Sequence, residues 1–328
     1  FPFCVRKCRY CDFLSGPADA GVRERYLRAL EREVTLSAEA LQSGGISSVP
    51  GESLTGRTAD CSRGHSAAKG EAGQDISGRS KRIAGSGAAD GQALCVDTVF
   101  LGGGTPSLMS GEELGHLMGV LRENFRILPD AEITMECNPG TVDREKLAEF
   151  RRAGVNRLSI GVQSFREEEQ RLLGRIHTAE EAKECFLDAR AAGFENISLD
   201  LISALPGQSG AQWMESLREA VRLSPEHISA YSLILEDGTP LKEEADAGKL
   251  PPLPEEELDR KMYHDTKNFL AQHGYHRYEI SNYAREGFES RHNSGYWTGH
   301  PYLGFGIGAA SYYGNYRWSH TGSLVRYL

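Results

Sequence analysis

Short apolar runs alternate with amphipathic segments along most of the chain. The runs predict buried strands, because each is short and is bounded by glycine, proline or polar residues. They lie at 96–101, 131–136, 157–162, 194–202 and 227–234, with 278–281 as a sixth candidate. Between them, apolar residues recur at helical spacing, which predicts helices at 23–42, 143–153, 178–192, 210–223 and 255–273. Strands alternating with helices predict an α/β fold with a parallel sheet.

Polar or glycine-rich residues follow several predicted strands. They occupy 102–107, 137–140, 163–164 and 205–208. Because the carboxyl ends of parallel strands meet on one side of a sheet or barrel, we expect a ligand site there.

Residues 44–92 differ from the rest of the chain. They are rich in Gly, Ser and Ala and contain no aromatic residue. Such a segment buries too little apolar surface to offset the entropy of ordering it, which predicts a disordered, flexible insertion. The folded core would then be residues 1–43 and 93–282, and 283–328 would begin a truncated C-terminal region. A first residue that is Phe, not Met, also indicates an incomplete chain.

Charge and composition argue against a nucleic-acid-binding protein and against a membrane-spanning one. Lys plus Arg number 37 against 46 Asp plus Glu, a net charge of −9. An acidic chain lacks the basic surface that nucleic-acid binding needs, so we expect no nucleic-acid partner. No run approaches the roughly 18 apolar residues of a transmembrane segment. An odd count of seven Cys suits a reduced compartment, and we expect a cytoplasmic protein, although an organelle-targeting segment could precede residue 1.

Three cysteines crowd the start of the chain. Cys4, Cys8 and Cys11 form a C-x3-C-x2-C motif. Thiolates bind zinc or iron–sulfur clusters. A zinc site would need a distant fourth ligand such as Cys61 or a His, whereas a [4Fe–4S] cluster held by three Cys keeps one iron open for a small molecule.

Residues 3–13, FCVRKCRYCDF, resemble the radical S-adenosylmethionine (SAM) superfamily. The resemblance implies a partial (β/α)6 barrel and a [4Fe–4S] cluster bound by Cys4, Cys8 and Cys11. It also implies that SAM chelates the open iron and is cleaved to a 5′-deoxyadenosyl radical. Tyr10, just before the third Cys, would pack near the adenine.

The same resemblance implies further contacts to SAM. They are Gly103, Gly104, Thr105, Glu136, Gln163, Arg175, Asp200 and Ala310. Taken singly, the glycines also fit an ordinary tight turn and the charged residues fit structural ion pairs. Arg175 could pair with a carboxylate, and Asp200 could accept hydrogen bonds from ribose hydroxyls.

Longer motifs resemble one group of that superfamily, the oxygen-independent coproporphyrinogen III oxidases. These are 103–106, 136–139, 161–165, 200–208 and 278–283. The oxidases carry a fourth Cys where this chain has Phe13, whereas the haem-chaperone branch, HemW, has Phe there. Residues 292–297, HNSGYW, also match the HNxxYW motif of that branch.

The HemW resemblance implies a chaperone that binds haem, with His292 as the candidate ligand, and delivers it to acceptor proteins. An electron donor for the cluster and a second copy of the chain are further candidate partners. Imidazole is a good axial ligand for haem iron, but a His in a packed loop is often only hydrogen-bonded, and His227, His276, His300 and His320 are competing ligands. Two other hypotheses remain: radical decarboxylation of coproporphyrinogen III, and a metal-stabilised α/β domain.

Overall fold

A computed structural model describes residues 1–43 and 93–328. The predicted insertion at 44–92, with Cys61, lies outside the described residues.

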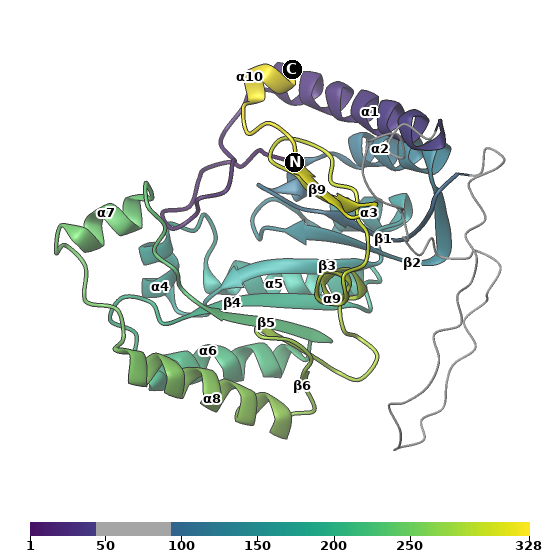
Figure 1. The fold of residues 1–328 in the computed structure, drawn as a ribbon. Coiled ribbons are helices and arrows are strands. Elements are labelled where there is room, and N and C mark those ends of the chain that lie inside the picture. Colours follow the sequence, from purple (N-terminus) through teal and green to yellow (C-terminus); the bar gives the residue numbers. More distant parts are fainter. Residues whose placement is uncertain (44–92) are drawn as a thin grey trace.

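Five parallel strands form the centre of the molecule (Figure 1). They are β1 (Cys95–Leu101), β2 (Arg126–Cys137), β3 (Arg157–Gln163), β4 (Ile197–Ser203) and β5 (His227–Ser232). Two short strands, β6 (His276–Arg277) and β7 (Asn282–Ala284), extend the sheet in the order β1-β2-β3-β4-β5-β7-β6. The sheet curls into a half-barrel, which confirms the expected partial β/α barrel.

One long helix precedes the first strand, and the other helices connect the parallel strands or follow them. They are α1 (Ala20–Gln42), the 3-10 helix η1 (Pro106–Leu108), α2 (Gly111–Asn124), α3 (Arg144–Ala153), α4 (Glu167–Leu173), α5 (Ala179–Ala191), α6 (Gly210–Leu223), α7 (Pro240–Asp246) and α8 (Glu256–Gln272). The C-terminal segment adds α9 (Arg291–Thr298), a hairpin of β8 (Ala310–Tyr313) and β9 (Tyr316–Ser319), and α10 (Leu324–Tyr327). None of the helices in the described ranges is long and apolar enough to cross a membrane.

Local sequence signals set several helix ends. Thr178 and Glu181 form a capping box at the start of α5, and Gly154 ends α3 in the left-handed conformation with φ 112°. The predicted α6 at 210–223 matches its observed bounds. Helices α2, α4, α7 and α9 are not among the helices predicted from the sequence.

The predicted sixth strand at 278–281 is wrong. These residues connect β6 to β7, and β7 pairs antiparallel with β5. The Glu279 carboxylate accepts hydrogen bonds from the backbone N–H groups of Ile280 (2.7 Å) and Ser281 (3.0 Å). This local bonding occupies N–H groups that a strand would present to its neighbour.

The two faces of the half-barrel differ in chemistry. On the convex face, Met135, Leu158 and Leu199 are fully buried and pack in one core with Phe150 of α3 and Phe186 of α5. Alternate residues of the same strands turn polar side chains to the concave face. These are Glu132, Thr134 and Glu136 on β2, Arg157 and Ser159 on β3, Ser198 and Asp200 on β4, and His227 and Ser229 on β5.

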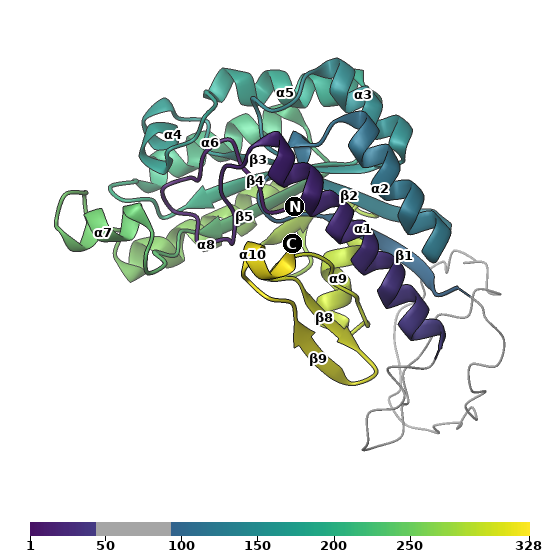
Figure 2. The same ribbon diagram turned by 90° about the horizontal axis from the view of Figure 1, so that it is seen from above.

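The C-terminal segment lies on the concave side. Figure 2 shows α9 and the β8–β9 hairpin on the opposite side of the sheet from α3 and α5. The Glu132 carboxylate accepts hydrogen bonds from the backbone N–H groups of Arg291 (2.8 Å) and His292 (3.1 Å), and from the Ser290 hydroxyl (3.2 Å). A buried carboxylate thereby binds the N-terminus of α9, where N–H groups lack partners within the helix.

Candidate functional site

The three motif cysteines lie on one loop that packs against the end of α4. The backbone N–H of Arg9 donates to the Leu173 carbonyl (3.1 Å), and the N–H of Cys11 donates to the Cys8 carbonyl (3.3 Å). Cys4, Cys8 and Cys11 are partly buried and are not in disulfides. The charges of Cys8 and Cys4 both act on the thiol of Cys11, so the sulfurs are close to one another.

Hydrogen-bond donors from other elements reach two of these sulfurs. Thr105 Oγ1 donates to Cys4 Sγ (3.3 Å), and Arg175 Nη1 donates to Cys8 Sγ (3.2 Å). Such donors stabilise thiolates, the form that binds metal. Within residues 1–43 and 93–328, no three His, Cys, Asp or Glu side chains surround a single ion position.

The glycine loop after β1 lies against the chain that leads into the cysteine loop. Gly103 has φ +111°, and a Cβ on Gly104 would lie 2.8 Å from backbone atoms of Phe3. Both positions therefore require glycine. The Gly103 N–H donates to Glu136 Oε2 (3.0 Å), which joins this loop to the end of β2.

Two acidic side chains face the concave side near the strand ends. Burial raises the pKa of Glu136 to about 7, and repulsion from Asp200 adds to the effect. Burial also raises the pKa of Asp200, although Ser159 Oγ donates to both of its carboxylate oxygens (2.8 and 3.1 Å). Two desolvated carboxylates on one face of the sheet are suited to binding a cationic or hydroxyl-bearing ligand.

Gln163 and Arg175 lie together at the end of β3. Gln163 is 6% exposed and has φ 69°, a conformation that costs free energy for a residue other than glycine. Arg175 Nη2 donates to the Gly161 carbonyl (2.6 Å) and to Asn138 Oδ1 (2.5 Å). Its Nε has no hydrogen-bond partner.

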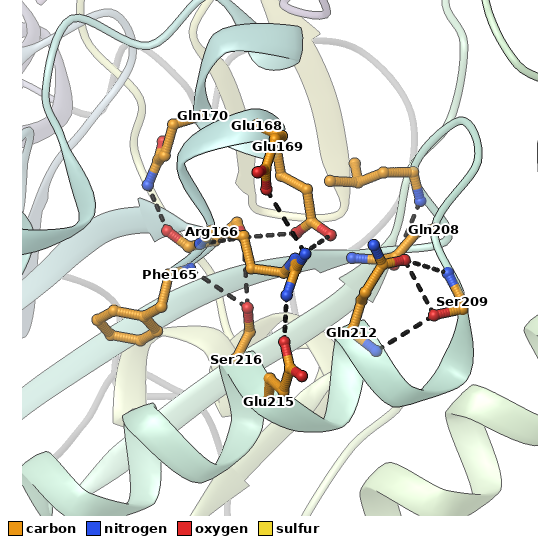
Figure 3. A network of polar contacts seen from close by, with 12 residues as sticks. Phe165, Arg166, Glu168, Glu169, Gln170, Gln208, Ser209, Gln212, Glu215 and Ser216 are labelled. Carbon is orange, nitrogen blue, oxygen red and sulfur yellow. Dashed lines mark hydrogen bonds and ion pairs between the residues drawn. The ribbon is translucent and has the colours of Figure 1, made fainter.

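A polar network fixes the strand end behind Gln163 (Figure 3). The Ser164 hydroxyl donates to Glu169 Oε2 (2.5 Å), and the Phe165 N–H donates to Ser216 Oγ (3.2 Å). Arg166 forms an ion pair with Glu215 of α6. These contacts join the β3 end to α4 and α6, so the backbone that carries Gln163 is held from two sides.

The structure brings most of the predicted SAM contacts together. Tyr10 interacts electrostatically with Arg175 and packs with the apolar cluster around Leu173 and Leu205. The contacts described above join the remaining members, which are Gly103, Gly104, Thr105, Glu136, Gln163 and Asp200. Ala310 is the exception: it is exposed at the start of β8, and no contact within the described residues joins it to this group. Its role stays a prediction.

His292 occupies the first turn of α9, not an irregular loop. Its Nδ1 is 2.9 Å from Thr98 Oγ1, and its Nε2 is 2.9 Å from the Tyr296 hydroxyl. The ring stacks on Phe100 of β1 with centroids 5.1 Å apart. Burial lowers the pKa of His292. The imidazole is therefore neutral near pH 7, which is the form that binds iron.

Three of the competing histidines also have partners, and His227 shares with His292 the pattern of one hydroxyl at each ring nitrogen. His227 is buried and bonds Ser198 Oγ (2.8 Å) and the Tyr278 hydroxyl (2.9 Å). His276 pairs with Glu289 (2.5 Å), and His320 pairs with Glu33 (2.8 Å).

The sequence analysis missed three side chains of this region. Thr98 and Phe100 hold His292, and Tyr231 of β5 donates to Gln163 Oε1 (3.5 Å). The alternation of polar positions along β5 was the available signal for Tyr231. A Cβ on Gly102 would lie 2.6 Å from the Phe100 ring and 3.2 Å from the Glu136 carboxyl carbon, so the ring that stacks on His292 also lies near Glu136.

Comparisons with known proteins agree with this geometry. The radical SAM superfamily model matches residues 84–220. The chain is 35% identical over its full length to the heme chaperone HemW of Bacillus subtilis and covers 73% of that protein. It is 43% identical over 65% of its length to the heme chaperone HemW of Escherichia coli, of which it covers 55%.

One solved structure shares the fold over nearly the whole chain. It is coproporphyrinogen III oxidase (HemN) from Escherichia coli, described as a radical SAM enzyme. The TM-score is 0.74 at 23% identity, and the match covers 99% of this chain and 66% of that one.

Proposed function

The chain belongs to the HemW branch of the radical SAM superfamily, and from this premise we propose that it binds haem, a [4Fe–4S] cluster and SAM, and delivers haem to acceptor proteins. We further propose a cytoplasmic location. An electron donor for the cluster and a second copy of the chain complete the proposed partners.

The cofactor residues have separable tasks in this proposal. Cys4, Cys8 and Cys11 hold the cluster, which supplies electrons and an open iron for SAM. The glycine loop at 102–104 leaves its backbone accessible to the methionine end of SAM, and Glu136 accepts from its amino group. Asp200 accepts from the ribose hydroxyls, while Gln163, Arg175 and Tyr10 complete the wall around the nucleoside.

The position of His292 carries the haem proposal. The imidazole is neutral, is oriented by Phe100 and Thr98, and lies on the concave side of the half-barrel. With the ring proton on Nδ1, His292 donates to Thr98, and the Nε2 lone pair accepts from the Tyr296 hydroxyl. In the haem complex, the iron would take the place of that hydroxyl at Nε2. Tyr296 and Trp297, 48% and 59% exposed, offer aromatic surface to a porphyrin beside this nitrogen.

Haem titration followed by visible absorbance tests this proposal. We expect one haem per chain in the protein with an anaerobically reconstituted cluster, and loss of at least tenfold in affinity in His292→Ala, because an axial bond is removed. His264→Ala, on the exposed side of α8, is the matched control and should bind as the wild type does. Binding that is absent, or indifferent to His292, would remove the main support for a haem chaperone.

Coproporphyrinogen III is the substrate for the competing enzymatic reaction. Phe13 stands where the oxidases have their fourth Cys, and its side chain is 59% exposed. We expect no SAM-dependent release of carbon dioxide from coproporphyrinogen III under reducing conditions. Turnover in that assay would favour the oxidase function.

A further inference from the structure

Arg157, on the concave face of β3, is a buried cation without a bonded partner. Its exposed fraction is 3%, and Nε has no hydrogen-bond partner. In the described parts of the chain, no ion pair or hydrogen bond to any of its guanidinium nitrogens is found. A buried guanidinium is costly unless its N–H groups find acceptors, so this group calls for a ligand.

A second unpaired donor lies beside it. Thr134 is directly opposite Arg157 in the β2–β3 register and is 0% exposed, and its Oγ1 has no hydrogen-bond partner in residues 1–43 and 93–328. Phe100, which stacks on His292, is opposite Thr134 in the β1–β2 register. Phe100, Thr134 and Arg157 therefore form one row across three strands, and the charge of Arg157 acts on His292.

The carboxylates of the concave face are already bonded to other groups. Asp200 interacts electrostatically with Arg157, but its oxygens accept from Ser159 and Ser198. Glu132 accepts from the N-terminus of α9. The donors of Arg157 and Thr134 are thus left for an acceptor that the chain itself does not supply.

We propose that Arg157 and Thr134 form a carboxylate-binding site, and that it takes a propionate group of haem. This inference rests on the proposed haem function. The planar guanidinium offers two parallel N–H groups to a carboxylate, and the Thr134 hydroxyl offers a third donor. The site lies in the same row as the ring that supports His292, so one haem can use both.

Access to this site requires α9 to move. The helix has no fully buried residue, and polar contacts hold its N-terminal turn to the sheet: Glu132 accepts from two of its N–H groups, Arg291 donates to the Asp130 carbonyl (2.7 Å), and His292 bonds Thr98 (2.9 Å). Tyr278, which also interacts with Arg157, accepts from Asn293 of α9 (3.4 Å). Haem binding would displace this edge of the helix and replace part of these polar contacts.

Ferric haem and its dimethyl ester, in which both propionates are esterified, test the proposal without any mutation. We expect the wild-type protein to bind haem about tenfold to a hundredfold more tightly than the ester, the range for a charge-assisted hydrogen bond. Arg157→Lys keeps the positive charge but loses the two parallel N–H groups of the guanidinium, so the ratio of haem affinity to ester affinity should fall several-fold. In Arg157→Met it should approach one. Arg222→Lys, an exposed arginine on α6, is the matched control and should keep the wild-type ratio.

Each alternative gives a distinct result. Equal wild-type affinities for haem and ester, with binding still dependent on His292, would overturn the carboxylate site and leave the haem proposal intact. Absence of binding by both would overturn both proposals. A loss of SAM affinity in Arg157→Lys with an unchanged haem-to-ester ratio would assign Arg157 to the SAM site instead. If Arg157→Met does not fold, Thr134→Val still tests the site: it should lower the ratio about threefold.

Discussion

The half-barrel presents two regions of contrasting design. The rim consists of the cysteine loop 4–11 with Gly103, Glu136, Gln163, Arg175 and Asp200. The floor consists of Thr98, Phe100, Thr134 and Arg157, with α9 packed on it. In the rim, Cys4, Cys8, Glu136 and Asp200 all accept hydrogen bonds from neighbouring elements, and Arg175 leaves Nε unbonded but uses its other nitrogens. In the floor, Arg157 Nε and Thr134 Oγ1 are buried donors with no hydrogen-bond partner among the described residues.

The difference indicates how each region meets its ligand. The rim is preorganised, because the glycine loop and the network behind Gln163 hold it in place without a ligand. The floor is covered by a helix that has no fully buried residue. We infer that SAM and the cluster enter a formed site, whereas haem enters a site that opens to receive it.

The largest expected effect is loss of the cluster with haem binding retained, which would show that rim and floor act independently. Cys8→Ala removes a proposed cluster ligand that the other two cysteines cannot replace, so the broad cluster absorbance of the anaerobically reconstituted protein should be abolished. Haem affinity should stay within about threefold, because the cysteine loop contributes no ligand to the floor. Cys185→Ala, a buried Cys of α5 outside the motif, is the control and should keep its cluster.

Either of two results would break this comparison. A cluster spectrum that persists in Cys8→Ala would show that the ligand assignment is wrong. A parallel loss of haem binding would show that rim and floor form a single cooperative unit.

The same contrast explains what the sequence could predict. Several rim residues lie in the last part of a strand or just after it, and β1 to β5 were predicted to within three residues at most ends, because their apolar runs and the polar or glycine residues that bound them are local signals. The exception was β2, which begins at Arg126, five residues before the predicted start. The roles of individual rim residues came from the family resemblance, not from these patterns.

The floor depends on contacts between distant parts of the chain. The bond from His292 to Thr98 spans 194 residues, and the bond from Ser290 to Glu132 spans 158. The motif HNSGYW pointed to His292, but nothing local indicated that these residues begin a helix capped by a carboxylate of another strand. Arg157 was treated only as a strand residue, since its lack of a partner is visible only in three dimensions.

The buried carboxyl group of Glu136 should lower the free energy of unfolding at neutral and higher pH. Its pKa is raised to about 7 by burial and by Asp200, against 4.5 ordinarily, so the folded protein holds a proton that the unfolded chain releases. The free energy of unfolding of the cofactor-free protein should therefore fall as pH rises from 5 to 8, with Glu136 contributing about 2 kcal/mol. Glu136→Gln carries no charge and lacks this contribution.

Denaturant unfolding at the two pH values measures the effect. We expect Glu136→Gln to match the wild type at pH 5 and to exceed its stability by about 2 kcal/mol at pH 8, while losing SAM affinity. Glu145 is exposed in the first turn of α3, so the free energy of unfolding of Glu145→Gln should differ from that of the wild type by less than about 0.5 kcal/mol at both pH values. Equal stability of Glu136→Gln and wild type at pH 8 would contradict a desolvated, strained rim.

The smallest expected effect is a change in haem affinity at the floor. Unlike most substitutions in a binding site, this one should strengthen binding. The Tyr296 hydroxyl, 2.9 Å from His292 Nε2, competes with iron for the same lone pair. Tyr296→Phe removes that hydrogen bond and keeps the ring, so haem affinity should rise about threefold, in line with a bond worth about 0.7 kcal/mol. Tyr313→Phe on β8 is the matched control, with no change expected. Weaker haem binding in Tyr296→Phe would mean that the hydroxyl contacts bound haem and does not compete with the iron.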